Sequence, residues 1–426
     1  MSNLSELLPA GAGAKSAKFV ASGTLASGQT VVLKTDGTVG AVAATGGNLV
    51  FGTPVAGNSS VVNVVSSTYD PVSGKVIIIY SDAGNSSYGT YVVGTVSGST
   101  ITYGTPTVYI TQNTGGYADI TYDTNANKVV IAWRGTSNYG RAIVGTVSGT
   151  SISFGSETIF ASAITIDIVC GFDSSSNKVL IVYSDGGNSY YATAIVGTVS
   201  GTSISFGSEA VMYSGRWITP QFAFDTVANK FGVGYKDEAN SYYATAAVLT
   251  ISGTSVSAGT STVMVSANLN MPAIAYDVSE GKFAYFNTNS NDGIGIVFSI
   301  SGTSIVVGNT TTFDAGLLPY QMFCAYVGST QGVLLAYNQY SSSTAKYIFA
   351  AISGTTITFS SSTTFDTIVI NQQIGVAYDA NTGTAVISYK GASSYLYSSA
   401  ASSGNSASFV GITDEAIANT ATGSVV

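Results

Sequence analysis

Residues 60–110 read SVVNVVSSTYDPVSGKVIIIYSDAGNSSYGTYVVGTVSGSTITYGTPTVYI, and the chain repeats this unit with substitutions up to about residue 404. One turn position anchors the register of each copy. The anchors lie 50 to 53 residues apart and are Asp70, Asp123, Asp173, Asp225, Asp277, Val327 and Asp379. A second marker, Ser-Gly, recurs once per copy from Ser97 to Ser403. Two independent markers therefore indicate seven repeats.

Each repeat contains four strand-like segments, which we name A to D in chain order. In the third repeat we expect them at 164–172, 178–183, 192–199 and 202–206, with the last running on to Tyr213. Apolar and polar residues alternate along them, as in half-buried strands. The A–B link places the anchor aspartate where its carboxylate can accept backbone N–H groups two residues on, as in an Asx turn. No helical segment long enough for a crossover is present, so the strands are antiparallel.

Seven antiparallel four-stranded units predict an all-β fold, a seven-bladed β-propeller. The seventh repeat lacks segment D, because the FGS or FGT pattern is absent after Ser403. The missing segment is found near the start of the chain: NLVFGTPV at Asn48–Val55 repeats STITYGTPTV at 99–108. We therefore expect this N-terminal strand to complete the last blade, a closure that leaves no free sheet edge.

The two ends of the chain resemble each other outside the repeats. Residues 18–32, KFVASGTLASGQTVV, and 408–426, SFVGITDEAIANTATGSVV, both begin close to Phe-Val and end in a β-branched run. We expect a small β module built from both termini, giving segments 1–44, 45–404 and 405–426. The final Gly-Ser-Val-Val looks like the middle of a strand. Either a partner subunit completes it or the natural chain continues.

Composition excludes several classes of function. Charged residues make up 8 % of the chain, the net charge is −8, and only three residues are arginines, so a nucleic-acid groove is not expected. We find no signal peptide and no membrane-spanning run. Cys170 and Cys324 occupy equivalent positions in repeats three and six, and we interpret both as buried free thiols.

The residues that carry most enzyme chemistry are scarce. The chain has no histidine, which removes Ser-His-Asp triads and most zinc sites. Each anchor turn supplies a single carboxylate, too few for a calcium loop. A sialidase-type site needs clustered arginines, but Arg134, Arg141 and Arg216 come from repeats two and four. We therefore expect no catalytic residue, no metal and no cofactor.

A glycosidase remains an alternative, because enzymes of this class need only two or three carboxylates. The acids outside the anchors that leave it open are Asp82, Asp119, Asp167, Asp185, Asp237, Glu238, Asp292, Asp314 and Asp366. Nothing in their spacing distinguishes any pair.

The B–C links are more varied than the A–B and C–D links and are rich in Tyr, Asn and Ser. In a propeller the B–C and D–A links share one face. Such residues suit adaptable recognition of a protein or a sugar. The candidate binding residues are Asn85, Tyr88, Tyr139, Asn188, Tyr190, Asn240, Tyr242 and Trp217. The alternative is that these tyrosines pack one blade against the next.

The opening MSNLSELLPAGAGAKSAKFVASGTLASGQTVVLKTDGTVGAVA and the ending FVGITDEAIANTATGSVV resemble the ends of virion structural proteins of tailed bacteriophages, especially those of marine and cyanobacterial hosts. The repeats between them are similar in style to those of tail-fibre and appendage proteins. The resemblance implies a virion component made in the host cytoplasm, without assigning any catalytic residue.

That resemblance implies a non-enzymatic tail fibre or host-attachment appendage. We expect it to contact other virion proteins through its termini, to form a homo-oligomer, and to bind a host surface glycan or protein, with no nucleic acid partner and no membrane insertion. A capsid-surface decoration or head fibre is the alternative, and a carbohydrate-active propeller enzyme is a minor one.

Overall fold

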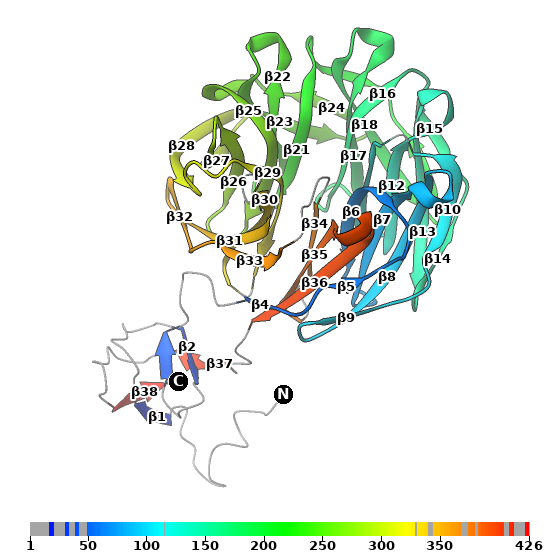
Figure 1. Ribbon diagram of the computed structural model, residues 1–426. Coiled ribbons are helices and arrows are strands. Elements are labelled where there is room, and N and C mark those ends of the chain that lie inside the picture. Colours follow the sequence, from blue (N-terminus) through cyan, green and yellow to red (C-terminus); the bar gives the residue numbers. More distant parts are fainter. Residues whose placement is uncertain are drawn as a thin grey trace. The chain divides into compact units, whose positions relative to one another are not determined.

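The structure is a computed structural model that describes residues 17–20, 30–33, 39–41, 49–114, 116–328, 330–339, 344–367, 374–379, 382–403, 409–412 and 422–425. Within these ranges the chain forms β-strands joined by turns and single turns of 3-10 helix (Figure 1). Two compact units are present: residues 50–402, and residues 1–49 together with 403–426.

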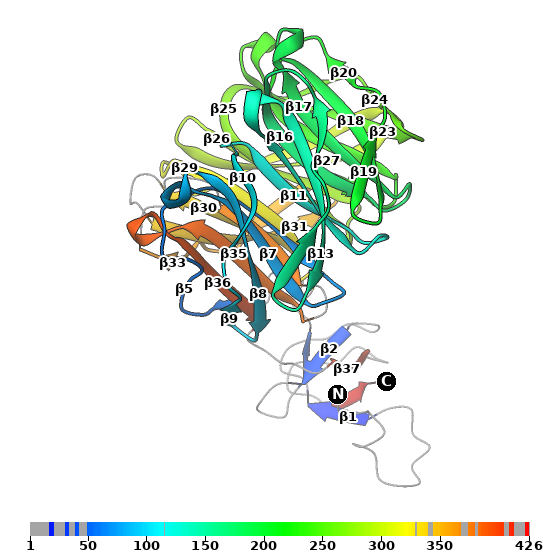
Figure 2. The same ribbon diagram turned by 90° about the vertical axis from the view of Figure 1, so that its right-hand side faces the viewer.

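The larger unit is a β-propeller whose blades follow one another along the chain (Figures 1 and 2). Strand A of each blade packs against strand A of its neighbours around the central channel, and strands B, C and D lie progressively outward. In most blades strand D is broken into two short pieces that both pair with strand C. The predicted all-β, seven-bladed propeller with antiparallel blades is confirmed.

Each blade takes its strands A, B and C from consecutive segments of the chain. Strand A is β6 (Val62–Asp70), β11 (Ala118–Asp123), β16 (Thr165–Asp173), β21 (Trp217–Asp225), the second half of β25 (Thr262–Asp277), β29 (Pro319–Val327) and β34 (Ile374–Asp379). Strand B is β7 (Lys75–Asp82), β12 (Lys128–Arg134), β17 (Lys178–Asp185), β22 (Lys230–Asp237), β26 (Lys282–Asn289), β30 (Gly332–Gln339) and β35 (Thr384–Lys390). Strand C is β8 (Tyr88–Ser97), β13 (Gly140–Ser148), β18 (Tyr191–Ser200), β23 (Tyr243–Ser252), β27 (Asp292–Ser301), β31 (Thr344–Ser353) and β36 (Leu396–Ser403).

Strand D is β9 (Thr100–Tyr103) with β10 (Thr107–Asn113), β14 (Ser151–Phe154) with β15 (Thr158–Ala161), β19 (Ser203–Phe206) with β20 (Ala210–Tyr213), β24 (Ser255–Ala258) with the first half of β25, β28 (Ser304–Phe313), β32 (Thr356–Phe359) with β33 (Thr363–Asp366), and β4 (Leu49–Phe51) with β5 (Val55–Ala56). In the third blade, strand D runs on to Tyr213 as predicted. The long strand β25 serves as strand D of blade 4 and strand A of blade 5, so these two blades form one continuous sheet.

The last blade is closed by the N-terminal strand, as the sequence predicts. β4 and β5 both pair with β36, and Tyr397 of β36 lies opposite Ala56. The Gly52 N–H donates to the Ala400 carbonyl at 2.9 Å, and the Gly57 N–H donates to the Leu396 carbonyl at 2.8 Å. The predicted strand is therefore present, in two pieces like strand D of most other blades. Figure 2 shows β5, β36 and β8 side by side at this join.

The anchor aspartates close strand A by capping the A–B turn. In blade 3, Oδ1 of Asp173 accepts the backbone N–H groups of Ser175 at 2.8 Å and Ser176 at 3.1 Å. Asp70, Asp123, Asp225 and Asp277 accept the two equivalent N–H groups in their own turns. The predicted Asx turn is confirmed, and it accounts for the recurrence of aspartate through local hydrogen bonding.

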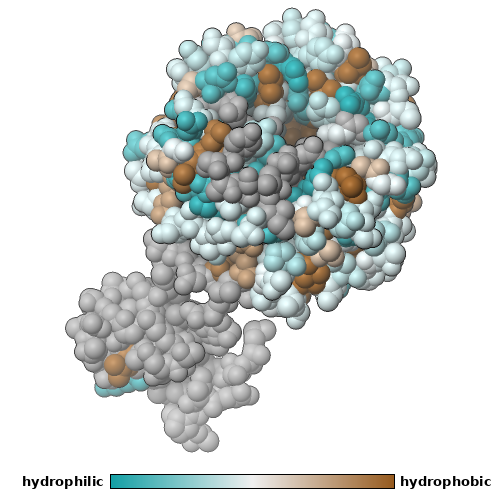
Figure 3. Space-filling model, in the orientation of Figure 1, coloured by the Kyte–Doolittle hydropathy of each residue, from teal (hydrophilic) through white to brown (hydrophobic). Residues whose placement is uncertain are grey.

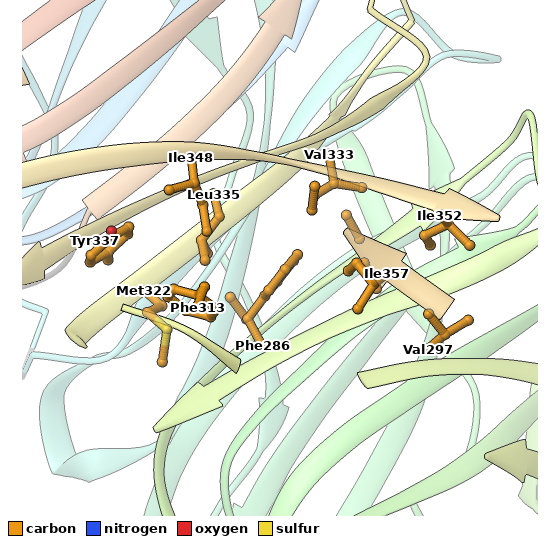
Figure 4. Packing of buried hydrophobic residues seen from close by; sticks show 14 residues of the cluster. Phe286, Val297, Phe313, Met322, Val333, Leu335, Tyr337, Ile348, Ile352 and Ile357 are labelled. Atoms are coloured by element: carbon orange, nitrogen blue, oxygen red, sulfur yellow. The ribbon is translucent and has the colours of Figure 1, made fainter. Parts of the chain in front are cut away.

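The hydrophobic core lies between neighbouring blades rather than within one. The aromatic residue ten positions after most anchors is almost fully buried there, at 0–2 % exposure. These residues are Tyr80, Trp133, Tyr183, Tyr235, Tyr337 and Tyr389. Figure 4 shows one such core, formed by Phe286, Val297 and Phe313 of blade 5 and Met322, Val333, Leu335, Tyr337, Ile348, Ile352 and Ile357 of blade 6.

The glycine of the FGS and FGT motifs has a packing role between blades. In blade 2 a Cβ added at Gly155 would lie 2.0 Å from the carbonyl oxygen of Thr202, which belongs to the C–D turn of blade 3. A backbone carbonyl cannot move aside without disturbing its own turn. Only glycine therefore lets the outer strand of one blade approach the next.

The smaller unit combines strands from both ends of the chain. β1 (Ala17–Val20) pairs with β38 (Thr422–Val425) in the register Lys18 to Ser424. β2 (Thr30–Leu33) lies between β3 (Val39–Ala41) and β37 (Phe409–Ile412). The predicted β module made from the two termini is confirmed.

Both cysteines are free. Cys170 is buried, as predicted, but Cys324 is half-buried, so that part of the prediction was wrong. Burial raises the pKa of both thiols well above the usual cysteine value, and the carboxylate of Asp119 adds to the effect at Cys170. Among the described residues, no helix has the length and apolar character needed to cross a membrane.

Candidate functional site

The B–C and D–A links lie together on one face of the propeller, which we call the recognition face. In blade 3 the Gly186 N–H of the B–C link donates to the carbonyl of Ile164 in the D–A link at 2.7 Å. On the opposite face, Lys230 after an A–B turn donates to the carbonyl of Gly302 in a C–D turn at 2.6 Å. The predicted division into two faces is therefore correct.

Three of the B–C links begin with an aspartate that caps a single turn of 3-10 helix. These turns are η2 (Ala83–Asn85), η4 (Gly186–Asn188) and η5 (Glu238–Asn240). The cap is Asp82, Asp185 or Asp237, and each carboxylate accepts the N–H two residues on, at 2.8–3.1 Å. Sequence reasoning missed this second set of caps, although the repeated Ser-Asp and Lys-Asp pairs before the links were a usable signal.

Two residues in the left-handed conformation follow each of these three turns. Their backbone conformation determines which tyrosine of the link is exposed at the surface. The second of them is Tyr190 (φ 58°) in blade 3 and Tyr242 (φ 60°) in blade 4. The same place is taken by Ser87 in blade 1, whereas in blade 2 the left-handed pair, Ser137 and Asn138, lies within the turn η3 (Thr136–Asn138). Tyr88 and Tyr139 come one position later, where strand C begins or is about to begin. The predicted tyrosines thus form two structural classes.

These two classes differ in exposure. Tyr190 and Tyr242 are 38 % and 37 % exposed, so packing between blades does not explain them. Tyr88 and Tyr139 are half-buried, which agrees better with the packing alternative. Of the three predicted asparagines, each the last residue of its 3-10 turn, Asn85 and Asn188 are exposed and Asn240 is half-buried.

Each exposed tyrosine has a cation close to its ring. The Cζ atom of Arg216 lies 5.9 Å from the ring centroid of Tyr190, and Nζ of Lys236 lies 5.0 Å from that of Tyr242. Such contacts hold the rings in place. Burial lowers the pKa of Lys236. A left-handed conformation is unfavourable for a bulky side chain, so two adjacent blades hold a strained tyrosine at the surface in the same way.

Trp217 is not part of this surface, which corrects the prediction. Its side chain is 1 % exposed and stacks on Tyr235, with ring centroids 4.4 Å apart and an interplanar angle of 19°. Trp217 begins β21 and packs in the core between blades 3 and 4. It lies next to the D–A link in sequence, but the strand turns its ring inward.

Most of the other acidic residues that could serve a glycosidase form hydrogen bonds within the protein. Asp167 accepts both Nε and Nη2 of Arg216, at 2.9 and 2.8 Å. Asp119 accepts Ser66 Oγ at 2.7 Å and the Cys170 N–H at 2.8 Å. Asp292 accepts the Gly316 N–H, and Asp314 and Asp366 accept the hydroxyls of Tyr337 and Tyr389. These contacts give each of the five carboxylates a structural partner.

The three arginines likewise have separate contacts. Arg141 pairs with Glu157 at 2.7 Å, Arg216 pairs with Asp167, and the Cζ of Arg134 lies 4.5 Å from the ring centroid of Tyr117. Within the described ranges, no three His, Cys, Asp or Glu side chains come together as a metal site requires. Figure 3 shows the described surface in one view as mostly pale or hydrophilic, with scattered hydrophobic residues.

No protein-family model matches the chain, and no curated protein matches it. Among solved structures, it is similar to the β-propeller domain of Cps50 (Swd1) from Myceliophteria thermophila, with 7 % identity, a TM-score of 0.53, and 83 % of this chain and 99 % of that chain covered. A mutant of Aleuria aurantia lectin in complex with α-methyl-L-fucoside matches at 12 % identity and a TM-score of 0.43, covering 68 % and 96 % of the two chains.

A mutant of the NanB sialidase from Streptococcus pneumoniae matches at 8 % identity and a TM-score of 0.46, covering 80 % of this chain and 68 % of that chain. At such low identity the likenesses establish only that the chain shares the β-propeller fold.

Proposed function

We propose that the chain is a non-enzymatic structural protein of a tailed bacteriophage virion, an outward-facing tail fibre or appendage that attaches to a glycan on the host surface. The sequence resemblance of both ends supports the virion assignment. In this proposal the terminal module binds other virion proteins, the protein assembles as a homo-oligomer, and the recognition face binds the glycan.

The single observation that carries attachment is the pair Tyr190 and Tyr242. They occupy the same position in adjacent blades, are exposed, and are held there by a strained backbone and a neighbouring cation. A flat, partly fixed aromatic ring offers contact area at low entropic cost and stacks on the C–H face of a sugar. Strain of this kind is often found at binding sites.

The structural roles of the carboxylates support binding without catalysis. A glycosidase needs one acid free to give a proton and a second free to act as base or nucleophile. Asp82, Asp185 and Asp237 cap turns, and Asp167 is held by Arg216. A carboxylate occupied in this way is poorly placed to transfer a proton to a substrate.

The test measures binding of the full chain to host cells and to purified host surface glycan. Replacing both Tyr190 and Tyr242 by Ala should weaken binding by roughly 1–3 kcal/mol without unfolding the protein. Val227→Ala is the matched control, because Val227 is 76 % exposed on the opposite face. Equal binding by all three proteins would reject the recognition face.

The location of the chain on the virion distinguishes a host-attachment protein from a capsid-decoration protein. An antibody against the chain should label the tail or an appendage of the virion. Labelling spread over the capsid would replace the attachment proposal by decoration, and absence from purified virions would reject both.

A further inference from the structure

The channel opening on the recognition face contains a cavity that the proposed surface contact does not use. Its volume is 540 Å³, within the range of about 300–1,000 Å³ that small-molecule sites occupy. The wall is made by residues near the start of strand A in several blades. Its polar members are Asn63, Tyr117, Asp167, Thr219, Gln221 and Gln321.

The strands bulge where they form this wall. The pairing of strand A with strand B shifts between Ile166 and Val169 in blade 3, between Ile218 and Gln221 in blade 4, and between Tyr320 and Phe323 in blade 6. The first bulged residue of these blades is Asp167, Thr219 or Gln321, and each lies six residues before its anchor position. A bulge re-aims a side chain, and here three blades place a polar residue against the cavity.

The bulged residues are strained in the same way. Their φ angles are 56° at Asp167, 45° at Thr219 and 50° at Gln321, in the left-handed region where glycine is usually found. Thr219 is β-branched, for which this conformation is especially unfavourable. Its Oγ1 atom is also buried and has no hydrogen-bond partner among the described residues. Backbone strain and an unsatisfied buried polar group, both in the wall of one cavity, are features often found at ligand sites.

The chemistry of the wall indicates the class of ligand. Within the described part of the chain, Asp167 is the one charged residue that lines the cavity. Arg216 neutralises it, since Nε and Nη2 of the guanidinium donate to the Asp167 carboxylate at 2.9 and 2.8 Å. The remaining polar groups are amides and hydroxyls, which both donate and accept hydrogen bonds. Pro220, Pro272 and Phe323 add apolar surface. The complementary ligand is neutral, rich in hydroxyl groups, and apolar on one side.

We propose that this cavity binds one neutral sugar residue, the terminal unit of the glycan that the recognition face contacts. The inference rests on the proposed attachment function and adds a second subsite, in the channel opening, to it. Arg216 joins the two, since the same guanidinium lies near the ring of Tyr190 and binds Asp167 in the cavity wall.

The test uses the full chain and methyl glycosides of glucose, galactose, mannose and fucose, with binding followed by ligand-observed NMR and calorimetry. Gln321→Gly and Thr219→Gly remove the wall side chains and relieve the strain. Gln331→Gly is the matched control. Gln331 has the same residue type and the same φ of 50° in the same blade, but it is exposed in the A–B turn on the opposite face.

We expect at least one glycoside to bind the wild type and the Gln331→Gly variant equally. Affinity should fall by about tenfold or more in both wall variants, because Gln321→Gly loses hydrogen bonds to the sugar and Thr219→Gly changes the shape of the wall. Their melting temperatures should equal or exceed that of the wild type, since glycine suits the left-handed conformation.

Two results would overturn the inference: no glycoside binds, or the wall variants bind as well as the wild type. Failure here is distinguishable from failure of the proposed function. A chain that attaches to cells through Tyr190 and Tyr242 but binds no monosaccharide in the cavity keeps the attachment function and loses the subsite in the channel opening.

Discussion

The carboxylate of Asp119 in blade 2 accepts the backbone N–H of Cys170 in blade 3 at 2.8 Å, 51 residues away along the chain. Its other oxygen accepts Ser66 Oγ of blade 1 at 2.7 Å. One side chain therefore joins strand A of three consecutive blades around the channel. Because each blade otherwise meets its neighbours mainly through apolar side chains, this contact sets the relative height of the inner strands.

Replacing Asp119 by Ala should destabilise the propeller. Two hydrogen-bonding groups lose their partner, at a cost of about 1–3 kcal/mol for each one that stays buried. Urea denaturation followed by tryptophan fluorescence measures the change in the free energy of unfolding. Asp119→Asn is the control, since an amide can accept from Cys170 and donate to Ser66. An alanine variant as stable as the asparagine variant would show that the bridge contributes nothing.

The same pair of variants gives a pH test. Burial raises the pKa of the Asp119 carboxyl. A carboxyl with a higher pKa in the folded chain binds its proton more tightly there, so its ionisation removes stability as pH rises through the folded pKa. Asparagine does not ionise. The stability of Asp119→Asn relative to the wild type should therefore rise as the pH increases above about 4, the usual pKa of an aspartate; a fall would contradict the assignment.

Gly155→Ala should strain the contact between blades 2 and 3. The added Cβ would meet the carbonyl oxygen of Thr202 at 2.0 Å, and overpacking of this kind costs about 1–3 kcal/mol. The measurement is the urea concentration at the midpoint of unfolding, which should fall while the slope of the free energy of unfolding against urea concentration stays unchanged. Ser156→Ala, at the next and exposed position, serves as the control and should have little effect. Equal midpoints for the two variants would mean that the outer strands have room to separate.

Removing residues 1–58 should open the ring, because β36 then loses β4 and β5. An unpaired strand edge pairs with other chains, so we expect aggregation or loss of cooperative melting. Removing only residues 1–44 retains both strands and is the control. Adding a peptide of residues 46–58 should restore cooperative melting by strand addition. A 1–58 deletion that stays monomeric with unchanged melting would disprove the closure.

The blade architecture could be predicted because it depends on local chemistry that is repeated. Asp173 caps its own turn within three residues, and the alternating strands on either side need no distant information. The closing strand was recognisable because Asn48–Val55 copies strand D of blade 1. Repetition makes distant pairing visible in a single sequence.

The recognition face was only partly predictable, because adjacent positions in a link are chemically alike. In NSYY, two neighbouring tyrosines differ only in backbone conformation, and Tyr190 is exposed while Tyr191 begins a strand. Trp217 was misplaced for a related reason. Its burial depends on Tyr235, which lies in the next strand of the blade. The cavity bulges leave no clear mark in the sequence, since Asp, Thr and Gln occupy them.

Trp217→Ala should therefore act on folding and not on attachment. Loss of a buried tryptophan costs about 3–5 kcal/mol, and here the stacking partner Tyr235 loses its contact as well. Chemical denaturation measures the loss. Binding to host cells, measured at a temperature where the variant is folded, should be unchanged. A folded variant with weakened attachment and normal stability would return Trp217 to the recognition surface.

The last prediction separates function from stability at Tyr190. Blade 2 has an asparagine, Asn138, as the second residue of its own left-handed pair (φ 61°), and asparagine tolerates this conformation better than tyrosine does. Tyr190→Asn should therefore raise the free energy of unfolding slightly, by about 0.5–1 kcal/mol, while weakening attachment. Structural residues lose stability when replaced, whereas strained binding residues gain it. If Tyr190→Asn lowers the melting temperature and leaves attachment intact, the ring of Tyr190 stabilises the B–C link by packing and does not bind the glycan.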